Sequence, residues 1–438
     1  MPEENFTNTL YTNDNLFVLN GLNSDLVDLI YLDPPFNTKR LFSAPIGSKA
    51  AGSSFKDMWN WQDVNEAYLD TLAENYPALT DFIASTSVVH SKAMAAYLTY
   101  MVQRIVEMHR VLKDTGSLYL HCDPTASHYL KVLLDEVFGK NNFRNEIVWC
   151  YKEREISKKY FNRKHDIIFF YVKSEKYLFN PTRLLEPYSK GTIKKFNYTD
   201  DDGRSFQIRG KGGEYTGKQG LDIKLEQTSP DLVYRDYLDK SGGILPRDWW
   251  EIPFLNRAAK ERTGYPTQKP LALLQRIIKA SSNEGDIVMD PFCGCATACV
   301  AAQQLGRKWI GIDVEENAVD ILIERLSDDA GMFKDFVATK LIPKRTDLTL
   351  EPPSQSVKER LYKEQNGCCN GCGNEYLMKD MEIDHIIPKA KGGGDYYENY
   401  QLLCGNCNRI KGKNTMEFLR IKIQTRKNLL KEKIIFGE

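Results

Sequence analysis

The sequence contains no run of 18 apolar residues, the length that a membrane-spanning helix needs. Its first residues, MPEENFTNTLYTNDN, lack the basic stretch and the apolar stretch of a secretory signal. Internal repeats and low-complexity tracts are also missing. These absences exclude the membrane-protein and fibrous classes, and we expect a cytoplasmic protein without a membrane partner.

What is present is ordinary for a folded protein with a sizeable core. The 438 residues are 42% hydrophobic and 27% charged, and this length is typical of two or three domains. The net charge of zero hides a local excess, because residues 151–218 hold 16 Lys or Arg against 9 Asp or Glu. Aromatic and Gly residues lie among these cations, which suits contacts with a nucleic acid. A solvated surface explains the excess equally well.

The ten cysteines are unevenly spread. A cytoplasmic chain is not expected to rely on a disulfide framework. Five of the cysteines lie within 40 residues near the C-terminus: Cys368, Cys369, Cys372, Cys404 and Cys407. Clustering of this kind indicates a metal site.

Strand and helix patterns alternate in two stretches of the chain. The first holds strands at 26–32, 117–123, 146–151 and 166–172. It also holds a helix at 94–112, whose end is expected at residues 113–116, and a second helix at 128–139. The second holds helices at 271–281 and 296–306 and strands at 286–292 and 308–314. This alternation predicts an α/β domain with a mostly parallel sheet.

Between and after these stretches the pattern changes. Residues 180–265 show no clear period and carry many turn signals, which is typical of a binding insertion. A polar, Pro-containing linker is expected at 341–357. The predicted layout is one domain at 1–340 and a smaller, metal-dependent domain at 358–438.

The segment DLIYLDPPF ends an apolar strand in an acid, two prolines and an aromatic ring. Side chains at the carboxyl end of such a strand face the ligand crevice. Asp33 and the Pro34 carbonyl can both accept hydrogen bonds from one amino group, and Phe36 can stack on the ring that carries it. An Asp-Pro turn with a core Phe is the simpler structural alternative.

A second segment, GDIVMDPFCGCATACVAAQQLGRKWIGIDV, has the layout of a nucleoside-binding βαβ unit. One strand ends at Asp290, a Gly-bearing turn follows, and the next strand ends at Asp313. The turn lacks the three glycines of a dinucleotide site, so a pyrophosphate cradle is not expected. An ordinary strand-turn-helix corner remains an alternative.

Together with GYPTQKPLALLQRI, these segments resemble the motifs of S-adenosylmethionine-dependent DNA amino-methyltransferases. Their order resembles the β class, in which the DPP[YF] motif precedes the target-recognition region and the cofactor turn comes last. The resemblance implies a Rossmann-like methyltransferase sheet with a circularly permuted motif order and an irregular target-recognition insertion. It assigns the flipped base and methyl transfer to Asp33, Pro34, Pro35 and Phe36. It assigns the cofactor to Asp14, Thr267, Lys269, Asp290, Phe292, Gly294 and Asp313.

The resemblance also implies a substrate. Aspartate at position 33 resembles the enzymes that methylate adenine N6 in double-stranded DNA, whereas the cytosine-N4 enzymes typically have Ser there. Cytosine-N4 specificity stays an alternative, and so does a homodimer. The chain departs from the family pattern at Ala296, where a second Gly is usual, and we expect its methyl group to narrow the cofactor turn.

The C-terminal region contains two C-x2-C pairs separated by 31 residues. Cys369 with Cys372 and Cys404 with Cys407 can form a tetrahedral thiolate site for Zn²⁺. Cys368 competes for the first position, and we prefer Cys369 because it makes the two pairs alike.

The segment around DHIIPKAKGGG closely resembles the HNH nucleases, whose domain is a small ββα-metal fold. The resemblance makes His385 the general base, Asp384 and Asn408 the ligands of Mg²⁺ or a similar divalent metal, and Asn399 the residue that orients the loop. Five cations are expected to face the DNA phosphates: Lys389, Lys391, Arg409, Lys411 and Lys413.

The preferred hypothesis is a single-chain modification and restriction enzyme that methylates adenine and cleaves or nicks DNA. A second hypothesis keeps the methyltransferase and makes the zinc-bound domain a DNA-binding module. A third, a DNA-binding protein without activity, would make the DPPF segment a coincidence.

Overall fold

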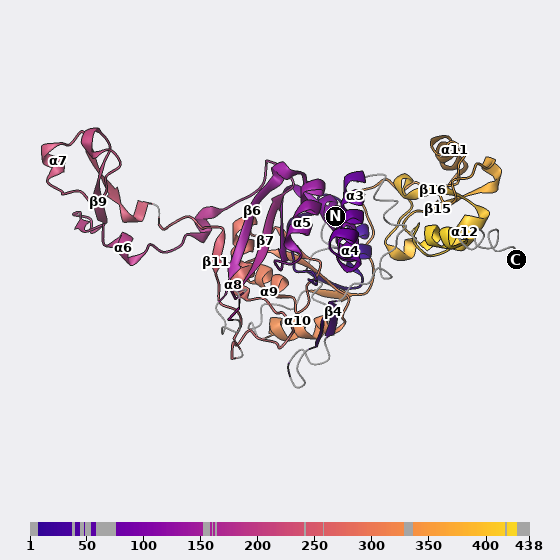
Figure 1. Ribbon diagram of the computed structural model, residues 1–438, viewed down its shortest axis with the longest axis horizontal. Coiled ribbons are helices and arrows are strands. Elements are labelled where there is room, and N and C mark those ends of the chain that lie inside the picture. The colour runs from indigo at the N-terminus through magenta and orange to yellow at the C-terminus, as the bar shows by residue number, and fades with distance from the viewer. Residues whose placement is uncertain are drawn as a thin grey trace. The chain divides into compact units, whose positions relative to one another are not determined.

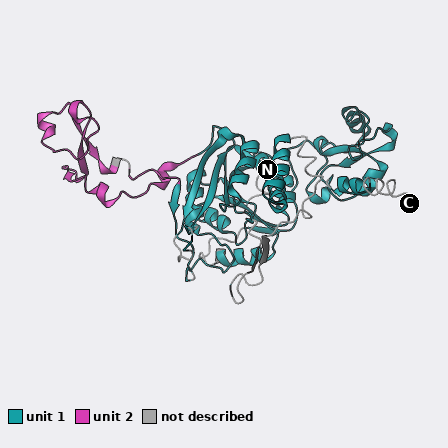
Figure 2. Cartoon of the chain, in the orientation of Figure 1, with its two compact units in different colours: residues 1–178, 249–438 teal, residues 179–248 magenta. Residues whose placement is uncertain are grey.

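The computed structural model describes residues 8–36, 40–43, 48, 54–57, 76–151, 158–159, 161–162, 164–240, 242–256, 258–327, 336–416 and 418–426. The chain divides into two compact units, residues 1–178 with 249–438, and residues 179–248 (Figure 2). Among the described residues, no helix has the length and apolar character to cross a membrane.

The larger unit is built on a nine-stranded sheet with the order β11-β6-β7-β5-β2-β12-β13-β1-β14. Figure 1 labels β6, β7 and β11 of this sheet. Its strands are β1 Thr9–Thr12, β2 Val27–Leu32, β5 Leu112–Cys122, β6 Phe143–Cys150, β7 His165–Val172, β11 Trp249–Glu251, β12 Ile287–Asp290, β13 Lys308–Asp313 and β14 Val337–Thr339. Its helices are α1 Asn15–Gly21, α3 Pro77–Val89, α4 Lys92–Val111, α5 Ser127–Leu134, α8 Leu271–Ser281, α9 Thr297–Gln304 and α10 Asn317–Ser327. A separate hairpin pairs β3 Arg40–Ser43 with β4 Ser54–Asp57.

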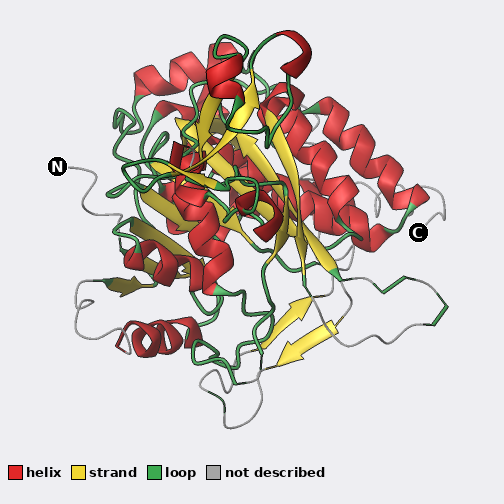
Figure 3. Ribbon diagram, turned by 90° about the vertical axis from the view of Figure 1, so that its left-hand side faces the viewer, coloured by secondary structure: helices red, strands yellow, loops and turns green. Residues whose placement is uncertain are grey.

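Helices cover both faces of this sheet (Figure 3). Alternate residues of a strand point to opposite faces, so β2 contributes side chains to two hydrophobic cores. Ile30 and Leu32 join the core with α1, α3, α4 and α5, while Leu29 and Tyr31 join the core with α8, α9 and α10. Burial on both faces explains why β2 is apolar at every position except Asp28.

The expected α/β class is confirmed, with one difference in strand direction. Neighbouring strands are parallel except at β7, which runs antiparallel to both β5 and β6. Residues 113–116, expected to end a helix, instead lie in β5, because α4 ends at Val111. The pairing that matters for the site is β2 beside β12, since it places Asp33 and Asp290 at one edge of the sheet.

The smaller unit contains a three-stranded antiparallel sheet in the order β10-β9-β8. Its elements are α6 Lys190–Ile193, β8 Tyr198–Thr199, β9 Ser205–Gly210, α7 Leu225–Thr228 and β10 Val233–Tyr237. Phe206, Ile208 and Val233 form its small core. This compact unit ends at residue 248, within the range 180–265 that the sequence predicts as an insertion, and β11 belongs to the large sheet.

The C-terminal region has a small core of its own. Its elements are α11 Gln355–Glu364, β15 Met381–His385, β16 Tyr400–Cys404 and α12 Gly405–Lys411. The two strands pair antiparallel and α12 follows directly, which gives a ββα arrangement. Helix α11 begins inside the range expected to be a linker.

Candidate functional sites

A cavity of about 540 Å³ lies where β2, β12 and β13 end. Every residue that the sequence assigned to the base and the cofactor lines it: Asp14, Asp33, Pro34, Pro35, Phe36, Thr267, Lys269, Asp290, Phe292, Gly294 and Asp313. Ligands of open α/β sheets bind at this edge. The fold therefore brings segments that lie more than 250 residues apart into one cavity.

Asp33 uses its two carboxylate oxygens differently. Oδ2 accepts a hydrogen bond from Lys269 Nζ at 2.5 Å. Oδ1 is buried and has no hydrogen-bond partner among the described residues. A buried acceptor without a partner is costly, so its presence in a cavity points to a donor that a ligand brings.

A buried polar network that the sequence analysis missed lies behind Asp33. His121 is fully buried at the end of β5 and contacts the Tyr31 hydroxyl through Nδ1 at 2.9 Å and Asp166 Oδ2 through Nε2 at 3.1 Å. Its Nδ1 lies 4.0 Å from Asp33 Oδ1, and its ring lies 5.8 Å from that of Phe36. Burial raises the pKa of Asp166, but the hydrogen bond and charge of His121 outweigh this, and the net pKa is lowered.

Two further carboxyl groups lie on the cofactor side of the cavity. Asp290 Oδ1 accepts from the Phe292 amide at 3.0 Å, and Asp313 Oδ2 accepts from the Gly294 amide at 2.7 Å. Burial raises the pKa of Asp290 well above its ordinary value and also raises the pKa of Asp313. A cation bound beside these two carboxyl groups would therefore favour their ionised form.

The turn between β12 and α9 approaches the cavity closely. Gly294 has φ +50°, and a Cβ there would lie 2.9 Å from the Tyr265 ring. Ala296 has φ +56°, in the left-handed region that favours glycine. The departure from the family pattern at Ala296 therefore introduces backbone strain, in addition to the expected extra methyl group.

The far end of the cavity is formed by the start of α1. Asp14 caps this helix by accepting from the Leu16 amide at 2.9 Å. Arg104, buried in α4, contacts Asp14 Oδ1 at 3.0 Å and Asn15 Oδ1 at 2.6 Å. Arg104 fixes the Asp14 carboxylate. The sequence did not predict this contact, because Arg104 lies within an ordinary helical pattern.

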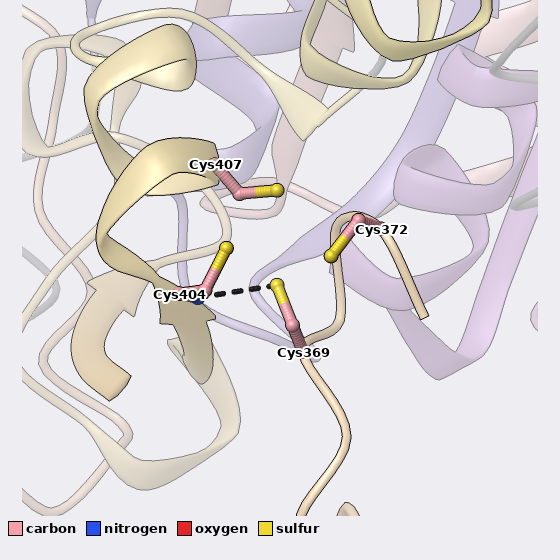
Figure 4. A group of neighbouring side chains, drawn as sticks. All are labelled: Cys369, Cys372, Cys404 and Cys407. Atoms are coloured by element: carbon pink, nitrogen blue, oxygen red, sulfur yellow. Dashed lines mark hydrogen bonds between the residues drawn. The ribbon is translucent and has the colours of Figure 1, made fainter. Parts of the chain in front are cut away.

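Four cysteines meet in the C-terminal region: Cys369, Cys372, Cys404 and Cys407. Their sulfurs all lie within 4.8 Å of one another and converge on one point (Figure 4). Four thiolates about 2.3 Å from a Zn²⁺ ion would lie about 3.8 Å apart, so the cluster has the size of a tetrahedral site. Cys368 is not in the group, and its thiol instead contacts the Asn366 carbonyl.

The expectation that Lys411 faces the phosphates is wrong. Lys411 is 1% exposed, and its ammonium lies 2.9 Å from Asp384 Oδ2 and 2.7 Å from the His385 carbonyl oxygen. Gln401 Nε2 donates to the same carboxylate at 2.8 Å. Lys411 sits on the inner face of α12, where an ammonium is stabilised only by such partners.

The other residues expected in the nuclease site make contacts of their own or are exposed. The Asn408 amide nitrogen donates to Glu382. The Asn399 side chain accepts from the Ile387 amide at 2.8 Å and donates to the Ile387 and Gly394 carbonyl oxygens, so it fastens the loop between them. Lys389, Arg409 and Lys413 are exposed, and Lys391 is half-buried.

His385 has a partner that the sequence analysis did not identify. Its Nε2 lies 2.9 Å from Asp395 Oδ1, and Tyr400 donates to the same oxygen at 3.1 Å. Lys389, through a hydrogen bond at 2.7 Å, is the main cause that lowers the pKa of Asp395 to about 2. An ionised Asp395 can only accept a hydrogen bond, so it favours the tautomer in which Nε2–H donates to it and Nδ1 carries the free lone pair.

Two regions of the chain match models of known protein families. Residues 27–324 match the family model described as DNA methylase, and residues 369–414 match the HNH endonuclease model. The chain is 31% identical over 377 residues to the type II methyltransferase M.EcaI of Enterobacter cloacae, which covers 78% of this chain and 74% of that protein. It is 27% identical over 323 residues to the DNA adenine methyltransferase YhdJ of Escherichia coli K12, which covers 74% of this chain and 83% of that protein.

Among solved structures, the PvuII DNA methyltransferase, described as cytosine-N4-specific, matches 77% of this chain and 99% of its own, with 12% identity and a TM-score of 0.42. The family match covers more than half of the chain. The chain therefore belongs to the DNA methylase family and carries an HNH endonuclease domain at its C-terminal end.

Proposed function

We propose that the chain transfers a methyl group from S-adenosylmethionine to the N6 amine of adenine in double-stranded DNA. The observation that carries the proposal is Asp33 Oδ1, a buried acceptor without a partner among the described residues, in the same cavity as the Gly294 turn. The adenine amine can supply the missing donor. Cytosine N4 also carries an amine, and the experiment below separates the two.

The residues on the other side of the cavity fit the cofactor. Asp290 is buried and Asp313 is partly buried, and Gly294 allows the backbone to approach a ligand where a Cβ would collide with Tyr265. We assign the methionine part to Asp290, Phe292 and Gly294, and the ribose hydroxyls to Asp313. Asp14 would lie by the cofactor's adenine, with Thr267 and Lys269 at its border. The bound cofactor would supply a methyl group on a positively charged sulfur.

The chain's own residues would prepare the nucleophile. The amine of adenine is a weak nucleophile because its lone pair is delocalised into the ring. Hydrogen bonds to Asp33 and to the Pro34 carbonyl would localise that pair, while Phe36 stacks on the base. The base must leave the duplex to reach the cavity, at a cost of roughly a few kcal/mol. After transfer, the amine loses a proton, and Asp33 Oδ1 is the acceptor beside it.

Methylated nucleosides provide the test. We expect DNA incubated with the purified chain and labelled S-adenosylmethionine to yield labelled N6-methyladenine after digestion to nucleosides. Asp33→Ala should reduce labelling by about 10²- to 10³-fold, as loss of a single positioned polar group does in other enzymes, while calorimetry still detects cofactor binding. Labelled N4-methylcytosine in place of N6-methyladenine would refute the adenine assignment.

We propose that the C-terminal domain cleaves or nicks DNA as a zinc-bound nuclease. Zn²⁺ would be held by the four cysteines, and the oxygens of Asp384 and Asn408 suit Mg²⁺ by their donor chemistry. Each carboxylate oxygen has two lone pairs, so Lys411 does not exhaust Asp384. The pair of His385 with Asp395 supports the base assignment, because it leaves Nδ1 ready to take a proton from water.

Cleavage of plasmid DNA in the presence of Mg²⁺ tests this second activity. His385→Ala should abolish cleavage and leave methylation of the same DNA unchanged. Asp395→Asn should weaken cleavage less, because it removes the orientation of the ring and not the base itself. A wild-type chain that binds DNA and never cuts it would favour the alternative of a DNA-binding module.

A further inference from the structure

Lys269 places an amine inside the methyl-transfer cavity. The residue is 7% exposed, and its Nζ lies 2.5 Å from Asp33 Oδ2 and 5.3 Å from the centre of the Phe36 ring. It also lies 3.4 Å from the Thr267 carbonyl oxygen. A buried ammonium needs such partners, so the cavity, and not solvent, is where this side chain is stabilised.

The segment that carries Lys269 is firmly held. The side chain of Gln268 donates through Nε2 to the Glu261 carbonyl oxygen at 2.6 Å. Its Oε1 accepts from the Thr263 backbone amide at 2.8 Å. Thr267 has φ +64°, an unusual conformation for a β-branched residue that the surrounding contacts must stabilise. These contacts fix the backbone from which the Lys269 side chain enters the cavity.

The position of the Lys269 amine matches what the proposed function asks of the target amine. That amine must donate to Asp33, lie against Phe36 and share a cavity with the cofactor turn, and Lys269 Nζ meets all three conditions. Arg104 offers a useful contrast, because this buried cation pairs with Asp14, a different carboxylate of the cavity, and not with Asp33. Lys269 therefore brings a second amine to the same carboxylate, on Oδ2, while Oδ1 stays open for the substrate amine.

We propose that Lys269 is a methyl acceptor of the DNA-free enzyme, so that the chain methylates itself at this residue. The inference rests on the proposed function, since it uses the same cofactor and the same carboxylate. The ammonium first gives a proton to Asp33. The freed lone pair then forms a bond to the methyl carbon, and the carbon–sulfur bond breaks with its electron pair passing to sulfur. The products are N-methyl-lysine in its cationic methylammonium form, a neutral thioether and one proton released through Asp33.

Peptide mass spectrometry can detect the modification directly. The purified full-length chain is incubated without DNA in S-adenosylmethionine carrying a deuterated methyl group, digested, and compared with a sample kept without the cofactor. We expect the peptide containing Lys269 to gain the mass of the labelled methyl group. An excess of DNA should slow this labelling several-fold, because the flipped base competes with Lys269 for the same methyl group.

Matched variants identify the acceptor. Lys269→Arg should remove the label, because a guanidinium keeps its proton. Lys260→Arg, an exposed lysine in the same connection, should leave the label in place. Asp33→Asn should reduce labelling of Lys269, since the amide cannot take up the proton.

A readout without the cofactor tests the ion pair in solution. Acylation of Lys269 by a small anhydride should be several-fold faster in Asp33→Ala than in the wild-type chain, because loss of the hydrogen bond to Asp33 frees the amine to meet the reagent. Equal acylation rates would refute the placement of Lys269.

The outcomes separate this inference from the function on which it rests. A chain that binds the cofactor and methylates DNA, yet shows no label on Lys269, overturns self-methylation alone. Label spread evenly over exposed lysines overturns it too. A chain that neither binds the cofactor nor methylates DNA overturns the proposed function and the inference together.

Discussion

The two candidate sites contain the same buried pair, a lysine against an aspartate, and use it differently. Asp33 pairs with Lys269 through one oxygen and keeps the other without a partner among the described residues. Asp384 has both oxygens engaged, since Lys411 contacts both and Gln401 donates to one. The first arrangement leaves one oxygen wholly open for a substrate, whereas the second ties α12 to β15 and leaves only the remaining lone pairs of two engaged oxygens for a metal ion. The same ion pair can therefore serve a ligand or a fold, depending on how many acceptor positions remain.

The two regions also differ in what supports them. The large sheet has a core on each face, whereas the C-terminal region has one small core that includes Cys369, Cys404 and Cys407. Small domains with little core usually need a metal or disulfides. Four predictions test these contrasts.

Removal of zinc should have the largest effect and should separate the two regions. Binding of zinc by a site of four thiolates contributes on the order of 10 kcal/mol to folding, so a strong chelator should unfold the C-terminal region and abolish cleavage. The nine-stranded sheet should persist, and methylation with it. Hydrogen exchange, followed by peptide, would measure both regions in one sample. Protection lost equally in the sheet would contradict the contrast.

Lysine substitutions should affect stability unequally. Lys411→Met leaves a buried carboxylate without its cation, which typically costs about 3–5 kcal/mol. Lys269→Met should cost less, because the Asp33 side chain is 17% exposed and the Asp384 side chain 9% exposed. Denaturant unfolding of each variant, monitored within its own region, would measure the two losses. A larger loss for Lys269→Met would reverse the interpretation of the two pairs.

Cofactor binding should release protons. Burial raises the pKa values of Asp290 and Asp313, so these groups hold more protons in the folded chain than in the unfolded one. Their contribution therefore destabilises the free chain as pH rises above about 3.9, the ordinary value for aspartate. The positive charges of the cofactor favour the carboxylates, so the affinity should increase with pH. Calorimetry in buffers of different ionisation enthalpy would count the protons, and an enthalpy independent of buffer would exclude the effect.

The smallest effect is expected at Ala296. Its left-handed conformation costs about 1 kcal/mol, which Ala296→Gly should partly recover as a higher melting temperature of the methyltransferase region. Ala298→Gly, in the helical part of α9, is the matched control and should destabilise by about 1 kcal/mol. A stabilising Ala298→Gly would show that strain at the turn is not the cause.

Much of this fold could be predicted from the sequence, since periodicity reports burial directly. Helix α8 covers the expected residues 271–281, and β2 begins one residue later than expected. Strand direction was not visible, because the apolar run of β7 reads the same in either direction. The short strands β8 and β10 carry charged or polar residues. Their pairing depends on a small core that cannot be predicted from the local sequence pattern.

The cavity was predictable for a similar reason. Strands that run parallel bring their carboxyl ends to one edge, so the strand pattern alone is enough to place Asp33, Asp290 and Asp313 together. The partners of these residues could not be predicted in this way. Lys411 looks like a surface cation in the sequence, and Asp395 looks like part of a polar loop, because only the tertiary fold decides which charges are buried together.

The adjacency of β2 and β12 has a consequence for protein synthesis. Asp33 leaves the ribosome 257 residues before Asp290, and at about 5–20 residues per second the cavity stays incomplete for tens of seconds. The last cysteine of the zinc cluster, Cys407, follows Asp290 by 117 residues. If both activities are as proposed, each new chain completes the site that marks DNA before it completes the site that cuts it. In every molecule, the residues of the methylation site are therefore synthesised before those of the cleavage site are complete.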